Sequence, residues 1–578
     1  MTCHFFFYEE FQCRCLANNA SCWPNASDWQ NFNASINGQL ISVQPSAAGC
    51  TGNPPDMNLC NLTLIQWTNA VWRSDQPGAM QSPNWENSTC SENEQGVSCT
   101  QGSVPRFGVK ATTIEQIQAT IQFASTHNLR LVIKTTGHDY LGRSTAADSL
   151  LLWVHHMKDI RLIPQYNSCT GEQISNPIRV AAGVQWGEVY TWLSQFNLIA
   201  IGGASPTVGA TGGYLQGGGH GPLTRWKGMA ADQILEFEVV TADGVRRIAN
   251  ACENTDLFWA LRGGGGGTYA VVVSVVLRTF PSPPMSAVIT VVAAETDDRY
   301  AQFLKDFVQF LPALSDAGWS GYFYITDRII TIAFFVPSRN FTGDMALYLR
   351  LLQNTTGLHI VRNDTYSFAS FYDLFVATLS QSNSGGGSVL LGSRLVPETI
   401  VRNRGDQLAD IFFKSRGEST NLSLLIGHLV AGGEVSQISV DNSINPAWRR
   451  ALLHMISTQG LPDNVSTSDM KRLLADLRQR VDLLQTVTEG EESGCYMNEA
   501  DANEPNWQQK FFGPRQLYDR LKSIKRKFDP NDLFICKNCV GSEDWTDDLN
   551  CRKASSSNRI SNHSFFILFV IKIFYWIY

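Results

Sequence analysis

The stretch Lys134-Thr-Thr-Gly-His-Asp-Tyr-Leu-Gly-Arg-Ser144 decides the fold of this chain. It follows the apolar run Leu131 to Ile133, which is typical of a short buried strand, and it contains the turn Thr136-Gly137-His138-Asp139. Glycine is used where the backbone takes positive φ or comes close to another group. The pattern therefore predicts a buried strand that runs into a tight turn carrying one histidine, His138.

Regular patterning extends outward from this turn, over residues 105–280. Apolar residues at helical spacing run from Thr113 to His127, and Thr112 or Thr113 is the expected cap. Strand-like runs follow at Leu150 to Val154, Arg179 to Ala182, Leu235 to Thr241 and Ala270 to Leu277. Helices and strands that alternate through glycine-rich connections are typical of an α+β nucleotide-binding domain.

Three glycine clusters lie in this region of the chain, at 202–213, 217–221 and 263–267. Successive backbone N–H groups bind phosphate well, so clusters of this density beside buried strands favour a dinucleotide. No cluster stands in the context that the G-x-G-x-x-G fingerprint requires, and G-x-x-x-x-G-K-[ST] is absent from the sequence. These absences disfavour a nicotinamide enzyme on a Rossmann sheet and a P-loop enzyme.

A second domain follows, over about residues 283–490. Strand-like alternation at Ala287 to Ala293 and at Ile329 to Val336 surrounds a helical stretch from Arg299 to Phe310. This predicts a largely antiparallel sheet with helices on one face. We expect five segments in all: an N-terminal extension, a nucleotide-binding domain, a substrate domain, a C-terminal segment that contains a helix at Pro514 to Phe528 and returns to the nucleotide-binding domain, and a disordered tail. Their bounds are 1–104, 105–282, 283–490, 491–545 and 546–578.

Composition restricts the partners and the compartment. The chain has 578 residues, 43% of them hydrophobic, and a formal charge of -7, so it can bury a large core but offers no basic stripe for nucleic acid. Most of its 14 cysteines fall before residue 100, where hydrophobic periodicity is weakest. Disulfides persist in oxidising compartments, and many N-glycosylation acceptor sequences lie beside these cysteines. We expect a secreted, disulfide-bonded glycoprotein.

Both ends of the chain depart from this picture. Residues 1–7 are followed at once by Glu9 and Glu10, which is not a signal peptide, and we expect a truncated or misread first exon. The apolar stretch from Phe565 to Tyr578 is interrupted by Lys572 and is too short to span a bilayer. A lipid-anchor signal after Ser555 to Ser557 is the membrane alternative to a gene-model artefact or a loose tail.

Several motifs together resemble the vanillyl-alcohol oxidase superfamily. The 134–144 stretch, Gly202-Gly-Ala-Ser-Pro-Thr-Val-Gly-Ala-Thr-Gly-Gly213 and Asp256-Leu-Phe-Trp-Ala-Leu-Arg-Gly-Gly-Gly-Gly-Gly267 are similar to its FAD-binding domain. Cys495-Tyr-Met-Asn-Glu-Ala-Asp501 and Phe528-Asp-Pro-Asn-Asp-Leu-Phe534 are similar to the end of its berberine bridge enzyme branch, and the cysteine-rich start resembles secreted fungal isoamyl alcohol oxidases. The resemblance implies an α+β fold with a two-lobed PCMH-type FAD-binding domain and a substrate domain whose antiparallel sheet is covered by helices.

The resemblance also implies a flavin site. The loop Thr136 to Ser144 would wrap the FAD pyrophosphate, and His138 would bond to the 8-methyl carbon of the flavin. Ser205 stands where many relatives have a second, cysteinyl attachment, so a single covalent link is expected. Val208 would occupy the position that gates dioxygen. The cofactor-binding residues implied are Thr136, Gly137, His138, Asp139, Tyr140, Gly142, Ser144, Pro206, Thr207, Val208, Gly209, Gly212, Gly213, Gly217, Gly219, Gly221, Val272 and Asn498.

Two residues are the catalytic candidates. Oxidation of an alcohol by a flavin needs a base for the hydroxyl proton, and Tyr496 lies in the segment that crosses the flavin in similar enzymes. A phenol near a positively polarised site loses its proton more readily; otherwise Tyr496 is a core tyrosine with a satisfied hydroxyl. His220 is either an acid/base group beside the flavin or a packing residue. Asp139 and Glu499 are further acids within reach.

We expect no metal ion. His155 and His156 are adjacent on an expected strand and would point to opposite faces, which is wrong for one shared ion. Cys536-x-x-Cys539 has no second pair with matching spacing, so a disulfide is the better interpretation of these two cysteines.

The favoured function is an oxidase that converts an alcohol or related C–H bond with dioxygen to a carbonyl or alkene and hydrogen peroxide. An oligosaccharide oxidase would need an aromatic-lined groove in the 283–490 domain. A tailoring enzyme of secondary metabolism is a further enzyme alternative. A binding protein on a decayed flavoenzyme scaffold would be colourless, whereas a covalent flavoprotein stays yellow after acid precipitation. A monomer that takes a small alcohol or sugar is expected.

Overall fold

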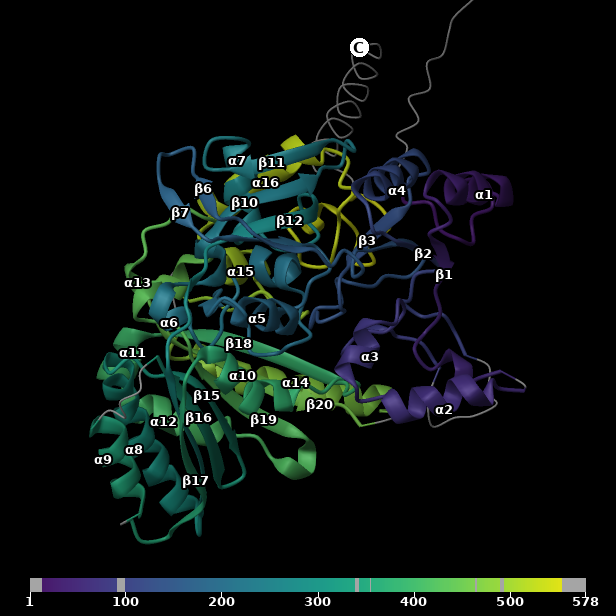
Figure 1. Ribbon diagram of the computed structural model, residues 1–578. Helices are drawn as coiled ribbons and strands as arrows, with labels where there is room; N and C mark the ends of the chain where they lie inside the picture. Colours follow the sequence, from purple (N-terminus) through teal and green to yellow (C-terminus); the bar gives the residue numbers. More distant parts are fainter. Residues whose placement is uncertain are drawn as a thin grey trace, which may run out of the picture.

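The computed structural model describes residues 13–52, 54–90, 99–337, 343–353, 355–462, 465–488 and 493–553. Figure 1 shows an upper region, built from the blue and yellow segments, and a lower region built from the green segments. The upper region carries a four-stranded and a five-stranded sheet, and the lower region carries a seven-stranded sheet. The α+β architecture with a separate antiparallel domain is therefore confirmed.

The first sheet of the upper region has the strand order β1-β2-β4-β3. Strands β2 (Phe107–Lys110) and β3 (Arg130–Lys134) pair in parallel with β4 (Ser149–Trp153), while β1 (Leu40–Ser42) adds to β2 in antiparallel register. Helix α4 (Ile114–Thr126) begins with Thr113 as its cap and buries Ile117 and Ile121. Because β1 belongs to the N-terminal extension, the extension completes this sheet.

The second sheet has the order β11-β10-β12-β8-β5 and is antiparallel throughout. Every residue of its central strand β12 is buried, since the sheet is covered on both faces. Its other strands and the helices that lie with them in the upper region are β5 (Ile160–Leu162), β8 (Ile178–Ala181), β10 (Ile234–Val240), β11 (Arg246–Asn250), α5 (Trp186–Ser194) and α7 (Thr255–Leu261).

The third sheet is seven-stranded and antiparallel, in the order β17-β14-β16-β15-β19-β20-β18. Its strands are β14 (Met285–Ala294), β15 (Ser320–Thr326), β16 (Ile329–Val336), β17 (Leu358–Phe368), β18 (Val389–Pro397), β19 (Ser423–Leu429) and β20 (Ala451–Gly460). Helices α8 (Asp297–Asp316), α12 (Gly405–Lys414) and α14 (Thr467–Gln485) belong to the same region. Phe323 and Ile325 of β15 join one core with α8 and α12, whereas Tyr322 of the same strand belongs to the core of the upper region. Period-2 alternation therefore gives the sheet a helix-covered face and a face toward the upper region.

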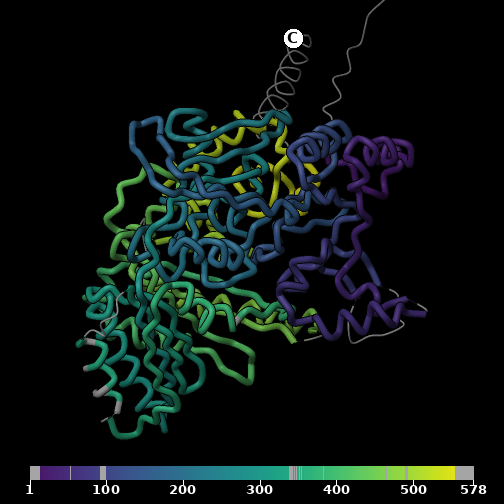
Figure 2. The backbone as a smooth tube through the Cα atoms, viewed as in Figure 1, coloured from purple at the N-terminus to yellow at the C-terminus, as the bar shows by residue number. Residues whose placement is uncertain are grey.

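The C-terminal segment returns to the upper region, as Figure 1 shows in yellow. The buried Lys525 of α16 (Arg515–Phe528) donates to the carbonyl oxygens of Thr268 at 2.8 Å and Phe534 at 2.7 Å, and forms a buried ion pair with Asp529. A disulfide between Cys13 and Cys551 joins the chain just past this segment, within 546–578, to the N-terminal extension. Figure 2 shows the purple extension beside both regions of the molecule.

Disulfides are frequent in the residues that the structure describes. Besides Cys13–Cys551, the pairs are Cys15–Cys22, Cys50–Cys60, Cys90–Cys99, Cys169–Cys252 and Cys536–Cys539. The last pair confirms a disulfide where the spacing alone also allowed a metal site to be considered. Within the described residues, no helix has the length and apolar character needed to cross a membrane. The C-terminal tail considered above as an anchor lies outside these residues.

One expectation about local structure is wrong. Strand β4 ends at Trp153, and His155 and His156 lie in the turn that follows it rather than on the strand. Their rings stand at 79° to each other, and His155 Nε2 is 2.7 Å from a carboxylate oxygen of Asp75. The chain turns at this point because Met157 N donates to the carbonyl oxygen of Val154.

Candidate active site

A cavity of about 1010 Å³ lies between the glycine loops and the seven-stranded sheet. Its wall combines the 135–144 loop, the glycine run at 203–213, the upper-facing side of the sheet and residues 496–499 of the C-terminal segment. Ligand pockets in proteins reach about this size for large cofactors and substrates. The cavity is therefore large enough for a dinucleotide together with a substrate.

The His138 loop is held by one carboxylate. Asp139 accepts hydrogen bonds from the backbone N–H groups of Leu141, at 3.3 Å, and Arg143, and from Arg143 Nε at 2.9 Å. Gly137 has a φ of +80°, and a Cβ there would lie 3.0 Å from the carbonyl oxygen of Ala79. Only glycine combines this backbone conformation with so close a neighbour. Gly137 and Asp139 are thus required for the loop conformation itself.

One ring nitrogen of His138 makes a hydrogen bond. Its Nε2 is 2.8 Å from Thr207 Oγ1, and the Thr207 hydroxyl donates to Asn383 Oδ1 at 2.8 Å. Because that hydroxyl proton is used on Asn383, Thr207 accepts from a protonated Nε2, which leaves the lone pair on Nδ1. Burial lowers the pKa of His138 to about 4, so the imidazole is neutral at neutral pH. A neutral ring with a free Nδ1 is the nucleophilic form.

Most residues expected from sequence to bind the cofactor line the cavity. Those in its wall are Thr136, Gly137, His138, Asp139, Tyr140, Ser144, Val208, Gly209, Gly212, Gly213 and Asn498. Thr207 touches His138 from behind the wall. Those outside the wall are Gly142, Pro206, Gly217, Gly219, Gly221 and Val272.

The glycines outside the wall allow close packing within the protein. A Cβ at Gly217 would lie 2.4 Å from Asn498 Nδ2, one at Gly219 would lie 2.6 Å from the Tyr214 ring, and one at Gly221 would lie 1.9 Å from the Gly202 carbonyl oxygen. These glycines pack against neighbours of the cavity and are not part of its wall.

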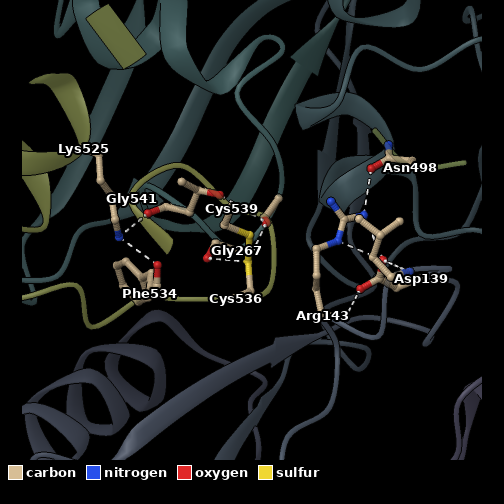
Figure 3. The surroundings of a disulfide bond; sticks show 12 residues. Asp139, Arg143, Gly267, Asn498, Lys525, Phe534, Cys536, Cys539 and Gly541 are labelled. Atoms are coloured by element: carbon tan, nitrogen blue, oxygen red, sulfur yellow. Dashed lines mark hydrogen bonds and ion pairs between the residues drawn. A yellow bond between two sulfur atoms is a disulfide. The ribbon is translucent and has the colours of Figure 1, made fainter. Parts of the chain in front are cut away.

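The two catalytic candidates both line the cavity, together with Glu499. Asn498 Nδ2 donates to the Tyr496 hydroxyl oxygen at 2.8 Å, and Arg143 Nη2 donates to Asn498 Oδ1 at 3.0 Å. Figure 3 shows Asp139, Arg143 and Asn498 converging at this point. Burial and the nearby Glu499 carboxylate raise the pKa of Tyr496. This direction is opposite to the lowered phenol pKa that the sequence argument assumed.

His220 lies in a cluster of imidazoles around Glu499. Its Nε2 is 3.0 Å from Glu499 Oε2, while His454 Nδ1 and His428 Nδ1 are 3.4 and 3.9 Å from the same oxygen. Burial alone would raise the pKa of Glu499, but the three imidazoles lower it to about 2. Burial lowers the pKa of His428 to about 3. The carboxylate is therefore ionised and His428 is neutral at neutral pH.

The domain at 283–490 supplies cavity-lining residues that the sequence analysis did not predict. They are the aromatic side chains Tyr322, Tyr324, Phe335, Tyr366 and Phe368 and the histidine His428, all on the cavity wall. Alternation along the strands was the available signal, because Tyr322 and Tyr324, and Tyr366 and Phe368, are two positions apart. Which of the two faces meets the cavity required the tertiary structure.

Comparisons with known proteins agree with this site. Residues 105–250 match the model of an FAD binding domain, and residues 495–540 match the berberine and berberine-like model. An uncharacterized FAD-linked oxidoreductase of Arthroderma benhamiae is 37% identical over 94% of this chain and 96% of its own length. The chain belongs to the berberine bridge enzyme-like branch of the vanillyl-alcohol oxidase superfamily. It is an FAD-linked oxidoreductase.

Solved structures extend the likeness over the whole fold. The VAO-type flavoprotein MtVAO615 of Myceliophthora thermophila C1 is 30% identical, with a TM-score of 0.86, and the match covers 94% of this chain and 100% of that chain. A glucooligosaccharide oxidase of Acremonium strictum with a 6-S-cysteinyl, 8α-N1-histidyl FAD is 20% identical, with a TM-score of 0.62, and covers 75% of this chain and 91% of that chain. The second likeness shows the shared fold.

The residues of this oxidoreductase fit FAD. Arg143 Nη1 and Gln216 Oε1 are buried without a hydrogen-bond partner among the described residues, and both side chains belong to the cavity wall. A Cβ on Gly213 would meet nothing within 4 Å, so the backbone there is open to a ligand. A guanidinium N–H matches a phosphate oxygen, and an amide oxygen matches a ring N–H. The wall thus offers unsatisfied groups of the kinds that a flavin dinucleotide would use.

Proposed function

We propose that this chain is a secreted FAD-dependent oxidase that converts an alcohol to a carbonyl compound and reduces dioxygen to hydrogen peroxide. The supporting observation is that one cavity contains both the neutral His138 and, in its wall, the polar group formed by Tyr496, His220 and Glu499. FAD, when bound, supplies the hydride acceptor and the reaction with dioxygen. The chain then has to hold the cofactor, place the hydroxyl and take its proton.

His138 is the proposed attachment point for FAD. Its Nδ1 makes no hydrogen bond within the described part of the chain while Nε2 is bound to Thr207, which suits attachment through Nδ1. Ser205 lies on the cavity wall and donates to Asn383 Oδ1 at 3.3 Å, but a hydroxyl cannot form the thioether that a cysteine forms. A single, histidyl link follows. Val208, also on the wall, is the proposed dioxygen gate.

Proton transfer is assigned to His220 backed by Glu499. When the His220 Nε2–H donates to the ionised Glu499 carboxylate, its buried Nδ1 has no partner among the described residues and can accept the hydroxyl proton. Tyr496 keeps its own proton because burial raises its pKa, so it serves as a hydrogen-bond donor that orients the substrate oxygen. Asn498 and Arg143 fix the position of that phenol.

A sugar substrate is the second candidate. Tyr322, Tyr324 and Tyr366 give the substrate-domain wall the aromatic lining that an oligosaccharide oxidase requires. Aromatic faces pack on the C–H surfaces of sugars, and phenol hydroxyls bond their oxygens. A simple aliphatic alcohol would leave the Tyr322 and Tyr324 hydroxyls unused, whereas the Tyr366 hydroxyl already donates to Asp364 Oδ2 at 3.0 Å. The unused phenols of the aromatic wall are what favours the sugar.

Secretion is proposed from the disulfides and the acceptor asparagines. Of the asparagines in N-x-[ST] sequences that the structure describes, Asn33 is half-buried and the rest are exposed: Asn19, Asn25, Asn61, Asn87, Asn363 and Asn421. Exposed asparagines can carry glycans without disturbing the core. Disulfides that join distant segments, such as Cys13–Cys551, persist in an oxidising compartment.

The test begins with colour. The purified protein should stay yellow after acid precipitation, and His138→Ala should lose the acid-stable flavin while its far-UV circular dichroism is unchanged. Peroxide production is then followed with primary alcohols, sugars and polyketide alcohols. Glu499→Gln and His220→Gln should lower kcat by about 10²–10⁴-fold, as loss of a general base does. A colourless wild-type protein, or equal peroxide rates in these variants, would refute the assignment.

A further inference from the structure

We propose that His220, His428, His454 and Glu499 form a binding site for one divalent transition-metal ion of the Zn²⁺ class. Each side chain offers one ligand atom, and these atoms all lie within 4.8 Å of one another. Three imidazoles and one carboxylate are a donor set that suits zinc and its neighbours in the first transition row, whereas Ca²⁺ and Mg²⁺ prefer oxygen ligands.

Three separate segments of the chain build the site. His428 of β19 and His454 of β20 are direct cross-strand partners in the sheet, so their side chains lie next to each other on one face. His220 comes from the second glycine cluster, and Glu499 from the C-terminal segment that returns across the cavity. A sheet register, a loop and a returning segment thus converge on one point.

The distances are close to those of a metal centre. Glu499 Oε2 is 3.0 Å from His220 Nε2, 3.4 Å from His454 Nδ1 and 3.9 Å from His428 Nδ1. Ligands about 2.0–2.1 Å from a tetrahedral ion stand about 3.3–3.4 Å apart. All four ligand atoms lie within 4.8 Å of one another, so an ion would have to draw the more distant of them closer.

Unsatisfied nitrogens are the second, independent observation. His454 is 0% exposed, and neither of its ring nitrogens has a hydrogen-bond partner among the described residues. His428 Nδ1 and His220 Nδ1 are also buried without a partner in the described structure. Buried polar groups are nearly always paired, and those that are not call for an explanation such as a missing ion. A metal ion would bind the lone pairs of His454 and His428 that have no hydrogen-bond partner in the described structure.

The site has one side toward the cavity. His220, His428 and Glu499 belong to the cavity wall, while His454 lies behind them. The four protein ligands would fill a tetrahedral ion, so water or the oxygen of a cavity ligand would bind as a fifth ligand, an expansion that zinc sites sometimes undergo. In that form the ion, rather than the His220–Glu499 pair, would polarise this oxygen. Binding itself does not depend on the proposed alcohol oxidation.

The experiment measures metal content of the full-length protein. The protein is stripped with a chelator, incubated with Zn²⁺, desalted and measured by inductively coupled plasma mass spectrometry, with acid-stable flavin determined on the same sample. We expect about one Zn²⁺ per chain, and a rise in the thermal unfolding temperature on reloading. His454→Asn and the near-isosteric Glu499→Gln should each reduce retained zinc to background, and both folds are checked by circular dichroism.

The matched control is His359→Asn, because His359 is an exposed histidine that pairs with Glu295 at 2.9 Å outside the cluster. It should retain zinc at the wild-type level. Wild-type protein that keeps no zinc after desalting, or Glu499→Gln protein that keeps as much as wild type, would overturn the proposal. Protein that binds flavin but no zinc would reject the metal site and leave the proposed oxidase function standing. Protein that binds zinc but no flavin would support the metal site and reject the proposed oxidase function.

Discussion

Thr207→Val should slow covalent flavin attachment. The Thr207 hydroxyl donates to Asn383 Oδ1 and accepts from His138 Nε2, each at 2.8 Å, and this chain of bonds keeps the His138 lone pair on Nδ1. Valine has the same shape and no hydroxyl, so the variant frees both ring nitrogens of His138 without opening a cavity. The nucleophilic tautomer is then no longer selected.

The size of the effect follows from one hydrogen bond. A neutral hydrogen bond contributes about 0.5–1.5 kcal/mol, and about 1.4 kcal/mol is a factor of ten in rate, so attachment should slow about 2- to 13-fold. The final amount of attached flavin should be unchanged, because the histidine itself is intact. Burial keeps the His138 pKa near 4 in both proteins, so the difference should be constant from pH 6 to 8.

The assay starts from protein produced under riboflavin limitation. FAD is added, samples are quenched in acid, and acid-stable flavin fluorescence on a denaturing gel is followed with time. Ser205→Ala is the matched control, because Ser205 donates to the same Asn383 oxygen at 3.3 Å and makes no hydrogen bond to His138 in the described structure. Wild-type attachment rates in Thr207→Val, or equal slowing in both variants, would refute the tautomer argument.

Three further predictions concern stability. Arg394→Met leaves the Glu504 carboxylate, which is 1% exposed, without its bidentate partner. The variant should lower the free energy of unfolding, measured in urea, by about 3–5 kcal/mol. Removing the Cys13–Cys551 disulfide with a double serine variant should cost about 2–5 kcal/mol in thermal unfolding, since the bond joins residues 538 positions apart. Burial would raise the pKa of Asp243, but its hydrogen bonds lower it to about 2. The ionised carboxylate therefore stabilises the folded protein above pH 4, and this stabilisation is lost toward pH 2. Asp243→Asn should lower the stability of the fold at pH 7 and have little effect at pH 2.

Each of these has its own control. Arg402→Met removes an exposed pair with Asp316 and should cost less than about 1 kcal/mol, so an equal loss in both arginine variants would contradict the burial argument. The double serine variant in reducing buffer should match the reduced wild type. An Asp243→Asn effect that stays constant between pH 7 and pH 2 would show that charge is not its cause.

Local structure was predictable where one pattern dominates. The strands at 150–154, 179–182, 235–241 and 270–277 and the helix after Thr113 were expected within one or two residues of where they lie, because period and capping are local properties. The prediction that His155 and His156 lie on a strand failed because the apolar run before them does not indicate where the strand ends and the turn begins. The missing second pair of cysteines favoured a disulfide partner for Cys536 or Cys539, and the structure shows that the two pair with each other.

The residues of the candidate site were likewise predictable only where they belong to one contiguous stretch of sequence. His138, the glycine loops, Tyr496 and Asn498 are recognisable from the chain alone, because each belongs to a contiguous motif whose backbone must take one particular path. The sequence alone therefore determined the family, the flavin domain and one side of the cavity. Tertiary structure decided the other side: Tyr322 and Tyr324 face the flavin domain rather than the helices only because of the way the two domains pack.

The histidine cluster is the clearest case. His220, His428 and His454 are far apart in sequence and share no motif, so no spacing rule could join them, and Glu499 was only one of several acids within reach. They meet because β19 and β20 pair in one register and because the C-terminal segment returns across the cavity. Contacts between distant segments depend on the packing of the whole chain, and local sequence patterns carry no information about it.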